Sequence, residues 1–183
     1  MTTLSKVTMI LLSLFLLNCG GTPTLESKKP TLLASDNITL SPEITEAMAQ
    51  SNEIRSDLYS NAPMKWNSTL ASSAQSYANR LANSGSFEHS GVSGYGENLF
   101  WSTKTSSYSD AVKAWYSESA YYDFRTLQCD TGKVCGHYTQ LIWKNTTQVG
   151  CGKALYKRGA NIGATVIVCQ YNPAGNYRGQ APF

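Results

Sequence analysis

The five cysteines are the sequence feature that most constrains the fold of this chain, because cysteines can pair as disulfides. One lies near the N-terminus and four lie in the second half. Cys129 and Cys135 are close together in a Gly-containing segment, whereas Cys151 and Cys169 fall on two predicted neighbouring strands. Four cysteines allow three pairings, of which local pairing, 129 with 135 and 151 with 169, is the simplest. A zinc site is the alternative, and export into an oxidising compartment favours disulfides over it.

The N-terminal segment indicates the compartment. Residues 7–17 are mostly apolar behind the single cation Lys6. This run is too short for a bilayer span, which needs about 20 apolar residues, but it has the length of a signal peptide. The residues Leu16-Leu17-Asn18-Cys19 resemble a bacterial lipobox, whose cysteine carries lipid. We therefore predict a signal peptide over 1–18, a lipidated Cys19, and an extracytoplasmic location with a membrane anchor. A secreted protein cleaved a few residues later is the alternative.

Composition and the positions of prolines divide the rest of the chain into two parts. Residues 19–41 hold Pro23 and Pro30 among Thr, Ser and Lys without apolar periodicity, which predicts a flexible tether. Residues 42–183 are long enough for one domain with a substantial core. The chain is 15% charged and 42% hydrophobic with a net charge of +3. These values exclude a disordered chain and a densely basic nucleic-acid binder, so we expect no nucleic-acid partner.

Apolar residues recur at helical spacing in several segments of this domain. Ser41-Pro42-Glu43 is a helix start with a capping serine and an early proline, and Asn61-Ala62-Pro63 is the predicted stop. Asn67 is the predicted cap of a second helix that ends at Gly85. A third helix is expected from Asp110 to about Phe124, and a short fourth over 137–144.

Strand character appears between and after these helices. Residues 96–101 are short and apolar, and residues 149–156 and 164–171 flank a basic, Gly-containing turn at 157–161. The last two segments predict a hairpin. Because helices come first and antiparallel strands later, the chain is of the α+β class with one sheet.

Several motifs in this region resemble those of one family. His137–Trp143 followed by Val149–Gly152 is similar to the first signature of the CAP superfamily, which comprises cysteine-rich secretory proteins, antigen 5 and plant pathogenesis-related proteins. Val166–Tyr177 resembles the second signature, and Phe87–Ser90 and Gly96–Leu99 match shorter motifs. The resemblance covers about residues 42–183 and is strongest to the plant members. It implies an α-β-α sandwich around a central antiparallel sheet, stapled by disulfides, and it supports the local cysteine pairing.

The resemblance also implies a central cleft lined by two histidines and two glutamates. Carried over position by position these are His89, Glu97, Glu118 and His137, and the chain has no other histidine. Neutral imidazoles are good zinc ligands, so His89 and His137 are the predicted metal ligands, with the carboxylates orienting them. A polar network that only fixes the cleft wall is the alternative.

Two functions follow from this expected cleft. The first is an exported binding protein for a lipid, a sterol or a host protein, with a weakly held divalent metal such as zinc. The second is a metal-assisted hydrolase, for instance a peptidase, in which Glu97 or Glu118 acts as general base. Catalytic zinc normally has three protein ligands, and only two histidines are present, so the sequence favours binding.

Overall fold

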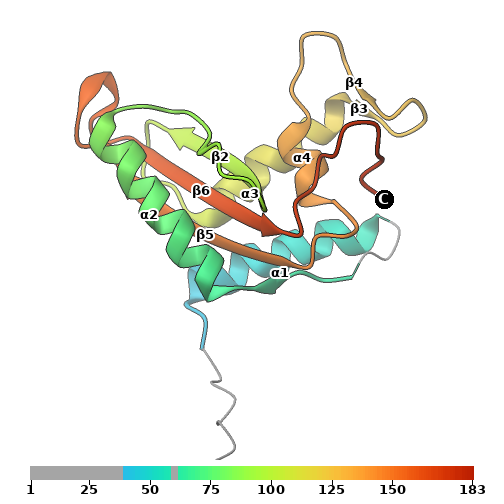
Figure 1. The fold of residues 1–183 in the computed structure, drawn as a ribbon, viewed down its shortest axis with the longest axis horizontal. Coiled ribbons are helices and arrows are strands. Elements are labelled where there is room, and N and C mark those ends of the chain that lie inside the picture. The colour runs from blue at the N-terminus through green and yellow to red at the C-terminus, as the bar shows by residue number, and fades with distance from the viewer. Residues whose placement is uncertain (1–38, 59–61) are drawn as a thin grey trace, which may run out of the picture. The chain divides into compact units, whose positions relative to one another are not determined.

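The structure is a computed structural model that describes residues 39–58 and 62–183 (Figure 1). The predicted signal peptide, Cys19 and most of the predicted tether lie outside the described residues. In the described part of the chain, no helix combines the length and the apolar character that crossing a membrane requires.

The first two helices begin where their caps were predicted. Helix α1 covers Pro42–Asp57, and the Ser41 side chain accepts a hydrogen bond from the Ile44 amide. Helix α2 covers Ser68–Ser84, with Asn67 as its N-cap and Gly85 as a left-handed C-cap at φ 79°. Helix α1 ends before the predicted stop at Pro63, because its C-cap residue Leu58 is already extended.

The third predicted helix differs from the structure at both ends. Helix α3 covers Tyr108–Ser117, and Asp110 is not its start but the partner of Ser107 in a capping box. After Ser117 the chain tightens into the 3₁₀ turn η1 over Glu118–Tyr121. The expected extension to Phe124 is wrong, since β3 (Tyr122–Asp123) pairs there with β4 (Gln128–Cys129). Helix α4 covers Gly136–Leu141 and is shorter than predicted.

The main sheet has the strand order β1-β5-β6-β2. Strands β5 (Gln148–Leu155) and β6 (Thr165–Asn172) form the predicted hairpin, whose loop contains the short turn η2 (Gly159–Asn161). Strand β2 (Gly96–Ser102) pairs antiparallel with β6. Strand β1 (Lys65–Trp66) adds a two-residue parallel pair on β5, which the sequence did not predict.

The central strand β6 separates two cores, which makes the predicted three-layer sandwich. Val166 and Val168 pack with α2 on one face, whereas Ile167 and Tyr171 pack with α1 and α3 on the other. Figure 1 shows α2 in front of the sheet and α1 and α3 behind it. The α-β-α prediction is therefore confirmed.

Glycines in β5 let α2 lie directly on the sheet. A Cβ on Gly150 would come 2.2 Å from the Ala71 amide nitrogen, and one on Gly152 would come 2.2 Å from the Gln75 Cα. No side chain fits at either position, so the Val149–Gly152 motif records a close approach of helix and strand.

Both disulfides have the predicted local pairing. Cys129 pairs with Cys135, and Cys151 pairs with Cys169. The second bridge joins directly opposite residues of β5 and β6, so it fastens the hairpin.

Candidate functional site

The first half of the candidate site is a histidine held by a buried carboxylate. Glu97 is the second residue of β2, and its Oε1 lies 2.9 Å from His89 Nδ1. The same oxygen accepts a hydrogen bond of 2.8 Å from the Ser90 amide. The Glu97 side chain is only 7% exposed, whereas that of His89 is 60% exposed. Strand β2 therefore fixes the carboxylate, and the carboxylate orients a histidine on a surface loop.

The second half joins η1 to α4. Glu118 Oε1 lies 2.6 Å from His137 Nδ1, and Oε2 accepts hydrogen bonds of 3.1 Å from the His137 and Tyr138 amides. These amides belong to the first turn of α4, whose own N-cap residue Cys135 makes no side-chain capping bond. Glu118 thus caps α4 from another element and places negative charge at the positive end of the helix dipole.

The two halves meet at one small cavity of about 210 Å³. Its lining includes His89, Glu97, Asn98 and His137, so the structure brings both histidines of the chain to the same space. Glu118 is not part of this lining. It lies behind His137, and both of its oxygens already accept hydrogen bonds.

The orientations of both histidine rings suit ligand binding from the cavity. Since each Nδ1 faces a carboxylate, Nε2 is the ring atom left for a ligand. Neither Nε2 is hydrogen-bonded to another of the described residues. Glu97 Oε2 is also buried without a hydrogen-bond partner among them. Within residues 39–58 and 62–183, however, no three His, Cys, Asp or Glu side chains are grouped as a metal site. The described residues thus bring two imidazoles to the cavity without a third side chain of these types grouped beside them.

Two residues that sequence reasoning did not place in the site bind backbone carbonyls of α4 or of the segment just after it. Asn98 is buried, and its Nδ2 donates to the His137 carbonyl at 3.0 Å and to the Tyr171 hydroxyl at 3.4 Å. Burial raises the pKa of Tyr171, so this hydroxyl stays protonated and the pair stays neutral. Asn98 lies inside the Gly96–Leu99 motif, so this motif was the sequence signal from which its role in the site could have been predicted.

Arg55 of α1 is the second such residue. It is fully buried, and its Nη1 donates to the carbonyls of Leu141 and Trp143 at the end of α4. Its position in the first helix gave no indication of these partners, because they are backbone atoms far along the chain.

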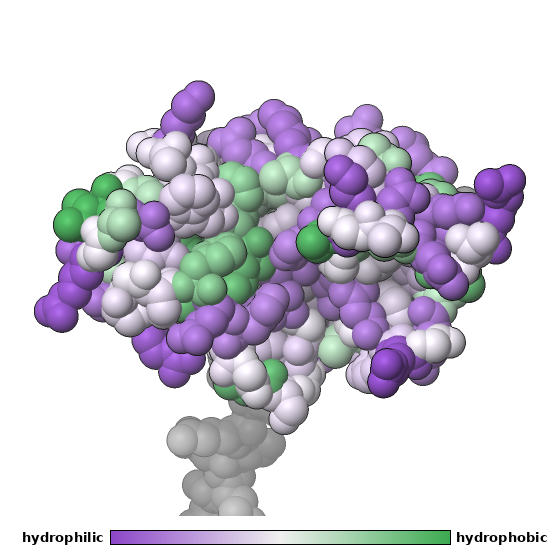
Figure 2. Space-filling view, turned by 90° about the horizontal axis from the view of Figure 1, so that it is seen from above, coloured by the Kyte–Doolittle hydropathy of each residue, from purple (hydrophilic) through white to green (hydrophobic). Residues whose placement is uncertain are grey.

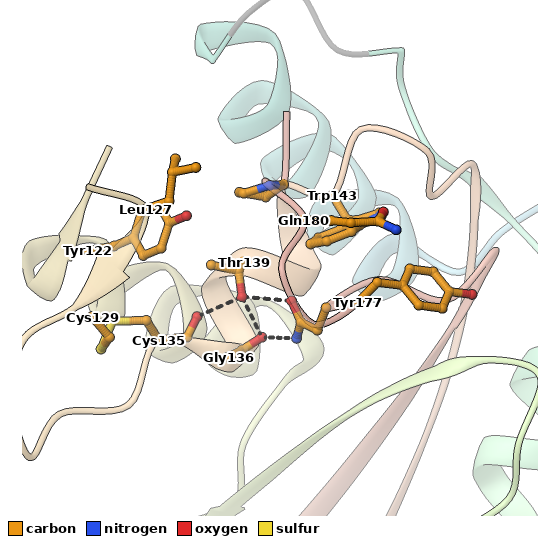
Figure 3. Close-up of a pocket in the computed structure, with 11 residues that line it drawn as sticks. Tyr122, Leu127, Cys129, Cys135, Gly136, Thr139, Trp143, Tyr177 and Gln180 are labelled. Carbon is orange, nitrogen blue, oxygen red and sulfur yellow. Dashed lines mark hydrogen bonds between the residues drawn. A yellow bond between two sulfur atoms is a disulfide. The ribbon is translucent and has the colours of Figure 1, made fainter. Parts of the chain in front are cut away.

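A second cavity, of about 330 Å³, is lined by Gly136 and Thr139 of α4 and by Trp143 just after it (Figure 3). Tyr122 and Leu127 stand on one side of it and Trp143 and Tyr177 on the other, with Thr139 between them. Gly136 and Asn176 line both cavities. The Asn176 side chain donates to the Gly136 carbonyl and accepts from the Thr139 hydroxyl, each at 2.7 Å. This pair of hydrogen bonds forms the partition between the polar cavity and the aromatic one.

Comparison with known proteins agrees with this architecture. Residues 49–171 match the family described as CAP, the cysteine-rich secretory protein family. The chain belongs to the CAP family. It is 43% identical over 121 residues to pathogenesis-related leaf protein 4 of Solanum lycopersicum, which covers 66% of this chain and 72% of that protein. The CAP domain of this chain is therefore of the plant pathogenesis-related type.

Solved CAP-like structures share the fold. BmVAL-1 superposes with a TM-score of 0.63 at 25% identity, covering 79% of this chain and 84% of that one. Na-ASP-1 superposes with a TM-score of 0.63 at 21% identity and covers 81% of this chain. The match spans only 43% of Na-ASP-1, so less than half of that protein corresponds to this one.

Proposed function

We propose that this CAP protein is an exported binding protein that uses the His89–His137 cavity to hold a divalent metal together with an external ligand. One observation supports the proposal above the others: each imidazole has its Nδ1 fixed by a glutamate and its Nε2 left for a ligand at one shared cavity. Imidazoles oriented in this way by carboxylates are the usual protein ligands of zinc. When bound, the metal would supply a Lewis-acid position for an oxygen or nitrogen of the ligand.

The same proposal includes export and anchoring through Cys19. The other four cysteines pair with one another, so Cys19 is the one cysteine outside the two disulfides. It follows the apolar run of residues 7–17 after the single residue Asn18, where the resemblance to a lipobox places the lipid-bearing cysteine. A lipid on Cys19 would keep the domain beside a membrane, and a tether over 19–41 would let it reach lipids or host proteins.

The larger cavity combines aromatic rings with the polar side chains of Thr139, Asn176 and Gln180, which suits a ligand with apolar and polar parts. Tyr122, Trp143 and Tyr177 offer flat apolar faces, and about 330 Å³ is near the lower end of small-molecule sites. A lipid or sterol that placed an apolar portion there and a polar group across the Gly136–Asn176 partition would engage both cavities. Lipid and sterol are therefore the ligand classes that we propose, with a host protein as the other partner class.

Zinc titration of the purified chain by calorimetry tests the metal part of the proposal. We expect one zinc per chain, and at least tenfold weaker binding in both His89→Ala and His137→Ala. Glu46→Gln, an exposed carboxylate on α1, is the control and is expected to bind zinc as the parent does. Unchanged zinc affinity in both histidine variants would remove the metal from the proposed function.

Metal-assisted hydrolysis is the second candidate, and one observation favours it. Glu97 lines the cavity, and its buried Oε2 accepts no hydrogen bond from the described residues, so this oxygen keeps its full capacity to accept a proton. Glu118 is less suited to that role, because both of its oxygens accept hydrogen bonds from α4. A zinc-dependent peptidase activity that Glu97→Gln abolishes without loss of zinc binding would establish hydrolysis over simple binding.

A further inference from the structure

The end of the main sheet that carries the β5–β6 loop contains basic residues and no acidic ones. Three segments meet there: 82–86 at the end of α2, 102–106 at the end of β2, and 155–165 around the hairpin loop. Together we name them the hairpin end. These segments contain the cations Lys104, Lys157 and Arg158 and not one Asp or Glu. The next acids along the chain are Glu88 and Asp110. All three cations are exposed, so the hairpin end presents only positive charge.

Hydrogen bonds hold the three segments together. The Lys157 amide donates to the Ala82 carbonyl at 2.9 Å, and the Tyr156 hydroxyl donates to the Ser86 carbonyl at 2.8 Å. The Thr165 hydroxyl donates to the Lys104 carbonyl at 2.8 Å. Tyr156 itself is 2% exposed. The cations therefore project from a fixed frame, which the buried Tyr156 anchors to the α2 core.

Apolar side chains protrude between these cations. Ile162 is 70% exposed and Leu155 is 51% exposed, although Tyr156 and Ala164 beside them are buried. At the left of Figure 2, apolar side chains stand out among hydrophilic ones at the end where Figure 1 places the β5–β6 loop. Isolated exposed aliphatic residues are common, but two of them among cations on a loop without acids form an amphipathic tip.

We propose that the hairpin end binds the surface of an anionic lipid bilayer. Lys and Arg near such a surface are attracted to its negative potential, and aliphatic side chains beside them enter the headgroup region. An acidic polysaccharide would use the cations but would gain little from Ile162 and Leu155, so the combination favours a membrane. This contact does not involve the His89–His137 cavity, and it does not require a lipid on Cys19.

Vesicle binding tests this surface in the chain from residue 20 onward, so that neither a lipid on Cys19 nor the apolar run of residues 7–17 contributes. The probes are vesicles of phosphatidylcholine with phosphatidylserine, compared with phosphatidylcholine alone. We expect Lys157→Gln with Arg158→Gln to weaken binding to the anionic vesicles about 30-fold, which corresponds to about 1 kcal/mol per cation. Ile162→Ser is expected to weaken the same binding roughly tenfold, because an aliphatic side chain no longer enters the bilayer.

Matched variants elsewhere on the surface serve as controls. Lys65→Gln with Lys113→Gln removes two exposed lysines, and Val92→Ser removes an exposed aliphatic residue of another loop. We expect both to bind anionic vesicles within twofold of the parent. Equal losses in controls and hairpin variants would overturn the proposal. It would also be overturned if the cation variant lost heparin binding while Ile162→Ser left vesicle binding intact, since the tip would then bind polyanions rather than membranes.

Discussion

Arg55 provides the sharpest test of how the site is supported. Its guanidinium is fully buried and donates five hydrogen bonds, of 2.9 to 3.2 Å, to the carbonyls of Ala62, Leu141, Trp143 and Thr146. Burial lowers the pKa of Arg55, which means that the protein disfavours the charge but offsets it with acceptors. Among the described residues no carboxylate accepts a hydrogen bond from Arg55, so carbonyl dipoles offset the buried charge.

Arg55→Met retains most of the aliphatic volume and removes every donor. The Trp143 carbonyl keeps the Thr146 amide as a donor, and Ala62 is exposed, so the buried carbonyls of Leu141 and Thr146 are the ones that lose their donor. A buried acceptor left unpaired costs about 2 kcal/mol, so the two groups give about 4 kcal/mol. Relief of the buried charge offsets a part of it, and we expect a loss of about 3 kcal/mol. With a urea m-value of about 2 kcal/mol/M, the unfolding midpoint should fall by about 1.5 M.

Urea unfolding followed by tryptophan fluorescence, with the disulfides intact, measures this loss. Arg125→Met is the matched control, because the Arg125 side chain is 91% exposed and pairs only with Asp123. We expect the control to change the free energy of unfolding by no more than about 0.5 kcal/mol. If Arg55→Met lost less than about 1 kcal/mol, the hydrogen bonds from Arg55 to these carbonyls would not stabilise the fold as the structure implies.

Two further predictions concern the fold around the site. Gly152→Ala should destabilise by about 3 kcal/mol or more in thermal unfolding, because its Cβ would overlap the Gln75 backbone. Gly136→Ala, whose Cβ meets nothing closer than 3.9 Å, should be tolerated, and equal losses in both would refute the steric argument. Hydrogen bonds from Ser107 lower the pKa of Asp110 from 3.8. The Asp110 carboxylate therefore stabilises the fold above pH 3.8. This contribution is lost as the pH falls through the lowered pKa. The stability gap between the parent and Asp110→Ala should therefore be present at pH 6 and close in acid, and a gap independent of pH would contradict it.

Local signals in the sequence predicted the elements whose physical cause is local. The caps of α1 and α2 are single residues beside the helix, and β6 is a continuous apolar run because both of its faces are buried. The prediction of the third helix was wrong at Tyr122. The helical spacing of apolar residues continues there, but the chain pairs as strand β3. The cysteine pairs were predictable because each pair is close in sequence or faces across one hairpin.

The site itself could not be derived from spacing. His89 and Glu97 belong to a loop and a strand, and Glu118 and His137 are separated by the β3–β4 segment, so no local pattern joins them. Their selection came from resemblance to a family, and the structure then placed them as two pairs. Arg55 shows why supporting residues are harder still: its partners are carbonyls, which every residue has.

These contacts give the two halves of the site different rigidity. Helix α4 has only six residues, too few to be stable alone, yet it carries His137. Glu118 binds its first amides and Arg55 binds the carbonyls at its end, so opposite charges match the two ends of its dipole. His137 is accordingly fixed from both ends of its helix. His89 has one carboxylate contact and lies mostly in solvent. A ligand that entered the cavity would meet one imidazole held through its helix and one held by a single carboxylate, so the larger share of the entropic cost of binding would fall on the His89 loop.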